Sequence, residues 1–357
     1  MDKRRRMAEA ARAAGFSLVL LAMIAWGNWY VDSYGVFRVT YDKIAACLAA
    51  KRNIAGLTES KANERDLAAA FIKNPDTRPE YGIFGSSRVF MFEGQMMGKE
   101  SFYNFGMSAA NLYDIIGLMG ALDSYDKIPG HVLICLEASL FNRETVTSQY
   151  WNEYIDYWNG LTGRPCKNTG YHIEKWFSPN YFKYNMGLFF SEGNAARYHV
   201  SVSDNWDNDL STKHYDGSLT YWSAYRYRNA ERLAVADEVK QVLDSGIIQR
   251  IHNYHEFDET MKQDFENMIR KLQSKGIEVS FYLPPYQADI YQYISEHEEY
   301  AVVAQMEEYV LDTASEAGIS VYGSYDPERS GLGMEDWYDP YHIVKEKVMS
   351  TFYLRQN

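Results

Sequence analysis

The chain has 357 residues, which is long enough for one large α/β domain or for a domain with a sizeable insertion. Its formal net charge is −12 and its basic residues cluster only at the N-terminus, which argues against a nucleic-acid partner. Its cysteines include no CxxC motif, and their odd number leaves at least one thiol unpaired within the chain: Cys47, Cys135 and Cys166.

A stretch without charged residues runs from Ala13 to Val31, directly after a basic segment. As a helix it would be about 28 Å long, close to the roughly 30 Å thickness of a bilayer core. Aromatic residues typical of a membrane interface lie at its far end: Trp26, Trp29 and Tyr30. We therefore expect a cytoplasmic basic tail at 1–12 and a retained single-pass anchor at 13–31, with the remainder exported. The alternative is a cleaved signal peptide, although no clear small-x-small site precedes a polar start.

Beyond the anchor, residues 32–78 predict a partly helical connector. Apolar runs then predict strands at 81–84, 102–105, 131–136, 278–283 and 319–322. The segments between them predict helices at 109–126, 229–246, 256–275, 296–316 and 343–355. This alternation of strands and helices predicts a mainly parallel sheet with helices on both faces.

A segment at about 140–228 interrupts the alternation and is rich in Tyr, Trp, Asn and Gly. We interpret it as an insertion at the edge of the sheet, within a single domain that covers 79–357. Its aromatic side chains suit contacts with a sugar or a partner, because they combine flat apolar faces with hydrogen-bond donors. They suit the filling of the insertion's own core equally well.

A Gly85-Ser86-Ser87-Arg88 turn follows the first predicted strand. Sites in open α/β sheets lie at the carboxyl ends of the strands, and a helix N-terminus there offers free N–H groups. A serine at this point can attack a carbonyl while the N–H groups stabilise the oxyanion. The alternative is that the serine only caps the next helix.

Asp339 and His342 lie three residues apart, just before the last predicted helix. At that spacing the carboxylate can contact Nδ1 of the imidazole and fix its tautomer, which leaves Nε2 to face a serine. A polar cap of the final helix would explain the same residues. The presence of the serine and this pair at opposite ends of one α/β domain favours nucleophilic acyl chemistry.

Four features of the chain together resemble the SGNH/GDSL hydrolase superfamily. They are the serine turn, the Asn-Phe-Gly-Met-Ser-Ala-Ala-Asn run at 104–111, the apolar run at 131–136 and the terminal Asp-x-x-His. With the N-terminal anchor, the layout is similar to its membrane-anchored, exported branch. That branch includes the D-alanyl transfer protein of teichoic acid synthesis and proteins of alginate O-acetylation. The resemblance implies a three-layer α/β/α, flavodoxin-like domain.

The resemblance also implies roles for single residues. Ser87 matches the nucleophile, although the assignment between Ser86 and Ser87 stays open by one residue. His342 matches the general base and Asp339 its orienting partner. The second block supplies a backbone N–H to the oxyanion hole, from Ala109 or alternatively from Gly106. Replacement of the usual Gly by Ala is mild there if φ stays negative.

The third block departs from the family pattern, which places an Asn side chain after the third strand as an oxyanion donor. Ser139 lies nearest to that place and Asn142 is three residues late. Loss of one such donor typically costs about 100- to 1000-fold in rate. Around the site we expect Arg88, Tyr286 and Trp337 to contact the substrate.

The sequence therefore predicts an extracytoplasmic serine esterase or acyltransferase that acts on acyl groups of a cell-surface or secreted polysaccharide. This chemistry needs no metal and no organic cofactor. The resemblance suggests a membrane-bound O-acyltransferase as partner, and a periplasmic or extracellular domain on the cytoplasmic membrane. The rival hypothesis is a catalytically inactive glycan-binding or scaffold subunit of a polysaccharide modification complex. A peptide or thioester hydrolase is a third hypothesis.

Overall fold

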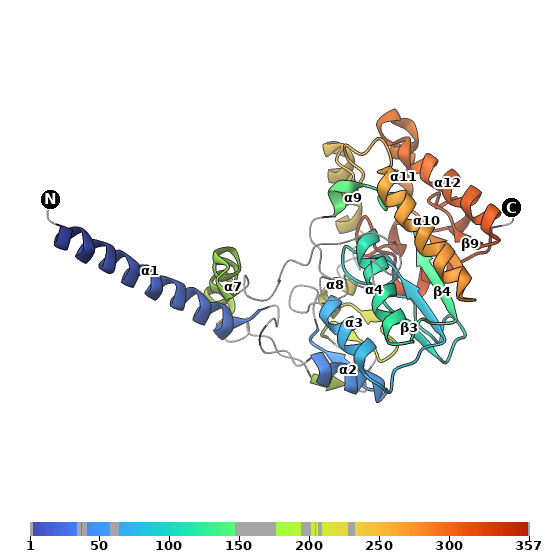
Figure 1. Ribbon diagram of the computed structural model, residues 1–357. Helices are drawn as coiled ribbons and strands as arrows, with labels where there is room; N and C mark the ends of the chain where they lie inside the picture. The colour runs from blue at the N-terminus through green and yellow to red at the C-terminus, as the bar shows by residue number, and fades with distance from the viewer. Residues whose placement is uncertain are drawn as a thin grey trace.

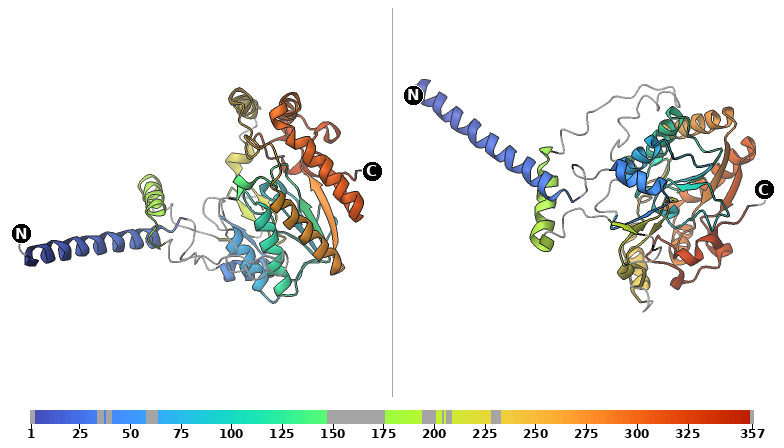
Figure 2. Two further views of the ribbon diagram at one scale, coloured as in Figure 1. Left: turned by 45° about the horizontal axis from the view of Figure 1, so that its top comes forward. Right: turned by 90° about the horizontal axis from the view of Figure 1, so that it is seen from below.

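A computed structural model of the chain describes residues 3–33, 37, 41–57, 64–146, 176–193, 201–203, 205, 209–227 and 233–355. It contains a mixed α/β unit built on a parallel sheet, and a long apolar helix that projects from this unit (Figures 1 and 2). The N-terminus lies at the far end of that helix, away from the sheet.

The parallel sheet contains all the strands that the apolar runs predict: β2 (Tyr81–Phe84), β3 (Phe102–Asn104), β4 (His131–Cys135), β8 (Glu278–Leu283) and β9 (Ser320–Gly323). Their order is β3-β2-β4-β8-β9, and every neighbouring pair is parallel. In chain order this is the 2-1-3-4-5 arrangement, in which ligands bind beyond the carboxyl ends of the first and third strands. The serine turn follows β2 at this point.

Side chains of the strands alternate between two apolar clusters, as a period of two requires. In β4, Val132 and Ile134 face one cluster, whereas Leu133 and Cys135 face the other. The first cluster is closed by helices, several of which lie in front of the sheet in Figure 1. These are α3 (Glu64–Lys73), α4 (Leu112–Ser124), α9 (Leu233–Ser245), α10 (Glu259–Ser274), α11 (Ala288–Glu296) and α12 (Val302–Ala317).

The other face of the sheet differs from the expectation of helices on both sides. Among the described residues it is covered by the short 3-10 helices η1 (Ser87–Val89) and η9 (Lys345–Thr351) and by turns. The helix expected at 343–355 stops early because the chain straightens to pair with β9. There the N–H of Gly323 donates to Tyr353 O at 2.9 Å, and the N–H of Arg355 donates to Val321 O at 2.9 Å.

A second, antiparallel sheet corrects the expected connector and defines part of the insertion. Its order is β5-β1-β6-β7, from β5 (Ser201–Ser203), β1 (Asn53–Ala55), β6 (Thr212–Lys213) and β7 (Leu219–Thr220). The connector therefore contains a strand besides α2 (Tyr41–Ala49) and α3, and its apolar residues join the main core. Residues 147–175 of the insertion, including Cys166, lie outside the described residues.

Short helices complete the described chain: η2 (Arg143–Thr145), α8 (Ser223–Tyr227), η6 (Glu298–Tyr300), η7 (Glu328–Ser330) and η8 (Met334–Asp336). At the N-terminus, α1 (Lys3–Val31) contains an apolar segment, Met7–Val31, that is long enough to span a membrane. Helix α7 (Pro179–Glu192), from the insertion, lies beside the end of α1 (Figure 1).

Because Gly85 has no side chain, the serine turn can pack closely against β4. A Cβ atom at this position would lie 2.6 Å from Cys135 Cβ and 3.2 Å from Val89 Cγ1. Its φ is not positive, so the requirement is for close packing of the turn on β4 and not for a left-handed backbone.

We expect Gly85→Ala to lower the free energy of unfolding by about 1–3 kcal/mol, because the methyl group overpacks the turn against β4. The measurement is chemical denaturation of the detergent-solubilised chain. Gly130→Ala is the matched control, since a Cβ there would meet its nearest atom only at 3.9 Å. Equal stability of the two variants would contradict the prediction.

Candidate active site

The two serines of the turn have different roles in the structure. Ser86 is buried, and its Oγ accepts the N–H of Arg88 at 3.2 Å, which caps η1. Ser87 is half-buried, and its Oγ lies 2.8 Å from Nε2 of His342. The geometry thus places Ser87 at the imidazole and gives Ser86 the capping role.

The Asp339–His342 segment is a tight loop closed by backbone pairing. Trp337 and Ile343 form an antiparallel bridge, and the N–H of Tyr338 donates to His342 O at 2.7 Å. Trp337 is only 1% exposed, so the expectation that it contacts substrate is wrong. It secures one end of the loop in the core because its large apolar ring is most stable there.

Asp339 holds His342 in the orientation that a general base requires. Its carboxylate lies 2.8 Å from His342 Nδ1 and accepts backbone N–H groups from Tyr341 at 2.7 Å and His342 at 2.8 Å. The hydroxyl of Tyr225 donates to the same carboxylate. Burial alone would raise the pKa of Asp339, but these hydrogen bonds and the charge of His342 hold the pKa below its ordinary value. Asp339 is therefore ionised at neutral pH and fixes the proton of His342 on Nδ1.

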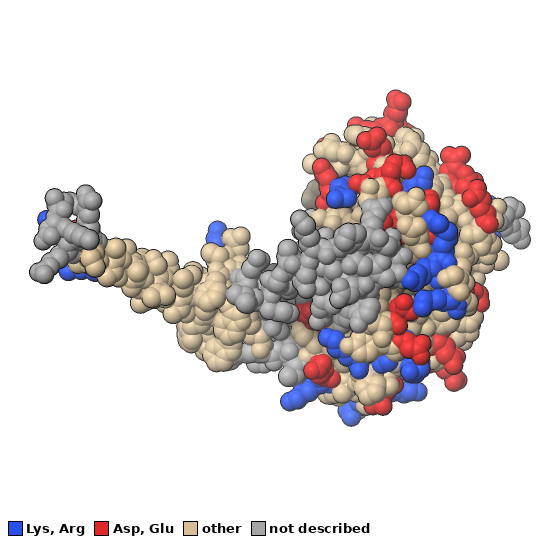
Figure 3. All heavy atoms as spheres, in the orientation of Figure 1, with Lys and Arg blue, Asp and Glu red and all other residues tan. Residues whose placement is uncertain are grey.

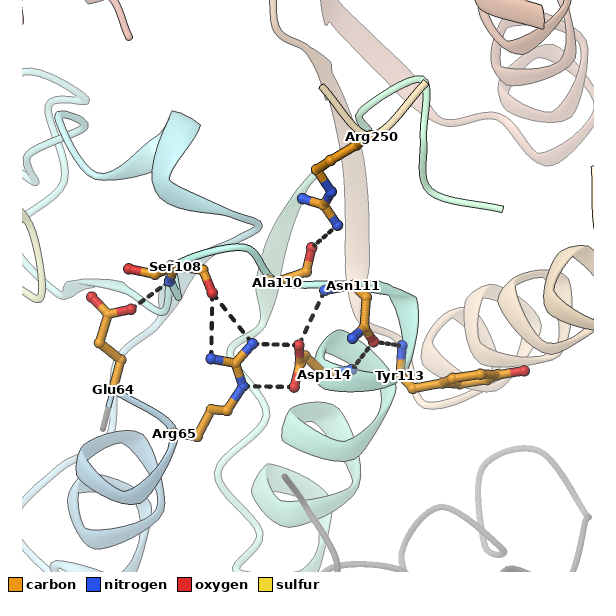
Figure 4. A network of polar contacts seen from close by, with 8 residues as sticks. All are labelled: Glu64, Arg65, Ser108, Ala110, Asn111, Tyr113, Asp114 and Arg250. Carbon is orange, nitrogen blue, oxygen red and sulfur yellow. Dashed lines mark hydrogen bonds and ion pairs between the residues drawn. The ribbon is translucent and has the colours of Figure 1, made fainter. Parts of the chain in front are cut away.

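The second block, residues 104–111, is held by a polar network that Figure 4 shows. The Glu64 carboxylate accepts the N–H of Ser108, and Arg65 donates to Ser108 O at 3.3 Å. Arg65 also forms an ion pair with the buried Asp114 at 2.6 Å. Arg250 donates to Ala110 O at 2.9 Å. The residues on both sides of Ala109 are thereby fixed.

Ala109 itself has a φ of +49°, so the condition under which replacement of the usual Gly would be mild is not met. An alanine in this left-handed region costs about 1–2 kcal/mol, and the fixed neighbours sustain it. Its N–H has no hydrogen-bond partner among the described residues, and the same holds for the N–H of Ser87. The alternative donor, Gly106, is wrong because its N–H already donates to Asn104 Oδ1 at 2.9 Å.

The third block provides no side-chain amide to the site. Asn142 caps η2 by accepting the N–H of Glu144 at 3.0 Å, and its Nδ2 donates to Arg250 O at 2.8 Å. Asn142 is therefore not an oxyanion donor in this arrangement. Ser139 is 2% exposed, and no hydrogen bond links it to Ser87 or His342 in the described part of the chain.

Arg88 and Tyr286 form one wall beside Ser87. The Arg88 guanidinium donates to Pro285 O and lies 5.4 Å above the ring of Tyr286. Tyr286 is 6% exposed, and burial raises the pKa of its hydroxyl, so its expected contact with substrate is wrong. Arg88 is half-buried and remains a candidate for contact with the substrate.

The insertion contributes aromatic residues that the motifs alone did not identify. The ring of Tyr221 lies 6.0 Å from the His342 ring, and Tyr225 contacts Asp339. Trp222 is 40% exposed and lies 4.8 Å from the Tyr225 ring. The aromatic density of this segment was the only available signal, and it could not place the segment against a loop more than 100 residues later.

Comparisons of the chain with family models, with curated proteins and with solved structures found no match. The site is thus defined by its geometry: a serine hydroxyl, an imidazole and an ionised carboxylate in one hydrogen-bonded line. That arrangement can activate the serine as a nucleophile.

We expect Tyr225→Phe to slow fluorophosphonate labelling of the serine by about tenfold, since a hydrogen bond to a charged carboxylate is lost. The loss also raises the pKa of Asp339, because the hydroxyl no longer stabilises the charged carboxylate. The measurement is the labelling rate against pH. Tyr227→Phe is the control, because Tyr227 is 61% exposed and its hydroxyl accepts from Arg226. Identical profiles for both variants would exclude a positioning role for Tyr225.

Proposed function

We propose that the chain is an extracytoplasmic serine esterase or acyltransferase that acts on acyl groups, such as O-acetyl groups, of a cell-surface or secreted polysaccharide. The observation that carries the proposal is the 2.8 Å separation between Ser87 Oγ and His342 Nε2, with Asp339 on the other side of the imidazole. A binding module does not require these three groups in hydrogen-bonding order.

In this mechanism Ser87 Oγ attacks the acyl carbonyl while His342 Nε2 accepts the hydroxyl proton. The N–H groups of Ser87 and Ala109 stabilise the oxyanion of the tetrahedral intermediate. His342 then returns the proton to the departing sugar oxygen, which leaves an acyl ester on Ser87. Water or an acceptor hydroxyl, deprotonated by His342, attacks that ester and regenerates the serine. Asp339 stabilises the imidazolium in both half-reactions.

The order of the parallel strands and the anchor-length helix support membership of the anchored, exported branch of SGNH-like proteins. In that assignment the domain lies in the periplasm or outside the cell, and a membrane-bound O-acyltransferase supplies acyl groups. These remain proposals because fold does not determine activity.

The exposed ring of Trp222 supports a sugar as the group that carries the acyl ester. It lies one ring away from Tyr225, which contacts the site carboxylate. A sugar stacked on this ring would lie on the side of the site where Tyr225 contacts Asp339, while its polar edges stay in water.

The first test is fluorophosphonate labelling of the full-length, detergent-solubilised chain. We expect Ser87→Ala and His342→Ala to abolish labelling, because they remove the nucleophile and its base. Ser86→Ala should retain labelling, since Ser86 only caps η1. Labelling of Ser87→Ala equal to wild type would refute the assignment of the nucleophile.

A catalytically inactive glycan-binding subunit is the second candidate, and one observation favours it. The side-chain amide of Asn142 is used within the fold, so the described site has two backbone donors and no third donor. Absence of labelling in the folded wild type would support this candidate over the enzyme.

We expect Trp222→Ala to raise KM for a chemically O-acetylated oligosaccharide by about tenfold, since loss of a stacked ring costs on the order of 1 kcal/mol. Hydrolysis of p-nitrophenyl acetate, which has no sugar to stack, should stay within twofold of wild type. Ile247→Ala is the control for loss of an exposed apolar side chain elsewhere. An equal loss with both substrates would show that Trp222 supports the site and does not bind sugar.

A further inference from the structure

Helix α7 packs closely against the C-terminal end of α1, although about 150 residues separate them in the sequence (Figure 1). Gly27 allows the close approach, because a Cβ atom there would lie 2.4 Å from the ring of Phe182. Tyr181 and Asn185, one turn apart on α7, are both buried in the contact. The two helices therefore form one unit with a defined register.

Buried polar groups fasten the two helices. Asn28 Nδ2 donates to Ser178 O at 3.1 Å, and Asn185 Nδ2 donates to Asn28 Oδ1 at 3.3 Å. Ser33 Oγ donates to Asn185 Oδ1 at 2.6 Å. Away from competing water, such bonds hold apolar helices together, as they do between helices within membranes. The unit therefore does not depend on apolar packing alone.

Exposed aromatic side chains lie on α7 and directly before its first residue. Phe190 is 83% exposed, and Trp176, Phe177 and Tyr184 are each more than a third exposed. The helix contains only two charged residues, Lys183 and Glu192. Figure 3 shows α7 and the part of α1 beyond its basic N-terminal end nearly free of charge, whereas charged side chains cover much of the α/β unit.

A chain of ring contacts joins these side chains to the exposed aromatic end of α1: Phe190 lies 6.2 Å from Phe189, which lies 5.8 Å from Tyr30, and Tyr30 stacks on the exposed Trp26 at 4.9 Å. Helix α7 has 14 residues, about 21 Å, which is too short to cross a bilayer core of about 30 Å. A short aromatic helix fixed beside the interfacial end of a membrane span is suited to lie in the interface itself. Lys183 can extend its ammonium group to the headgroups.

We propose that α7 is a second membrane-contacting element that lies in the outer interface of the bilayer. The exposed side chains of Tyr184 and Phe190 on α7, and of Phe177 just before it, contact lipid, and α1 crosses the bilayer beside them. This inference is independent of the proposed esterase activity, because it rests on helix packing and on exposed aromatic side chains.

The test places the photo-crosslinking residue p-benzoylphenylalanine at Phe190 of the full-length chain, in nanodiscs of phosphatidylethanolamine and phosphatidylglycerol. The substitution keeps an aromatic side chain at an exposed position, so the fold is not disturbed. After irradiation, intact-mass spectrometry should show lipid adducts for this variant. The same residue at Tyr184 should give them as well.

The control carries p-benzoylphenylalanine at Ile247, which is 54% exposed on the α/β unit and should give no lipid adduct. Adducts at Phe190 at least tenfold above those at Ile247 would support the proposal. Adducts at Phe190 no more frequent than at Ile247 would overturn it. Crosslinks from Phe190 to a second copy of the chain, in place of lipid, would overturn it too and would assign this face to self-association.

Discussion

The side chain of Asn104 connects the three segments on which the site depends. It is fully buried at the end of β3, and its Nδ2 donates to Val89 O at 2.6 Å and Phe92 O at 3.0 Å. Its Oδ1 accepts the N–H of Gly106, and its backbone N–H donates to Asp216 O at 2.7 Å. The serine turn, the second block and the insertion are thereby fixed to β3. The side-chain amide of Asn104 uses both its donors and its acceptor in these hydrogen bonds, so few other side chains could replace it without leaving a buried polar group unpaired.

The other half of the site is built separately, and the two halves meet across the bond between Ser87 and His342. The bridge of Trp337 with Ile343 sets the loop, and Asp339 fixes the imidazole within it. The bonds that orient the imidazole come mainly from within the loop, and Tyr225 of the insertion adds one to Asp339. An imidazole and a hydroxyl that are each held independently keep their distance without rearrangement, and this is the pre-organisation that nucleophilic catalysis requires.

The sequence could predict the parallel sheet because each strand is a compact apolar run, buried on both faces. The meeting of Ser87 and His342 was expected from the two motifs and the family they resemble, because the strand edge places only Ser87: β9 ends at Gly323, well before His342. The antiparallel sheet could not be predicted, because its strands have only two or three residues each. Strand β1 also pairs with β5 and β6, which follow it by more than 140 residues. Trp337 and Tyr286 were misplaced because an aromatic residue beside a motif has the same local pattern whether it faces the core or the substrate. The φ of Ala109 depends on Glu64, Arg65 and Arg250, which no local pattern reveals.

The insertion contacts two other parts of the molecule, the helix α1 and the loop that carries Asp339. Its α7 is fixed to α1 at the end of the apolar span, and its α8 carries Tyr225, which donates to Asp339. Both lie between β4 and β8 in the chain. The insertion thus contacts both the candidate membrane span and the site carboxylate. Under the proposed function the substrate is held at the cell surface, and each unproductive orientation of substrate and serine that is excluded in advance lowers the entropic cost of reaction.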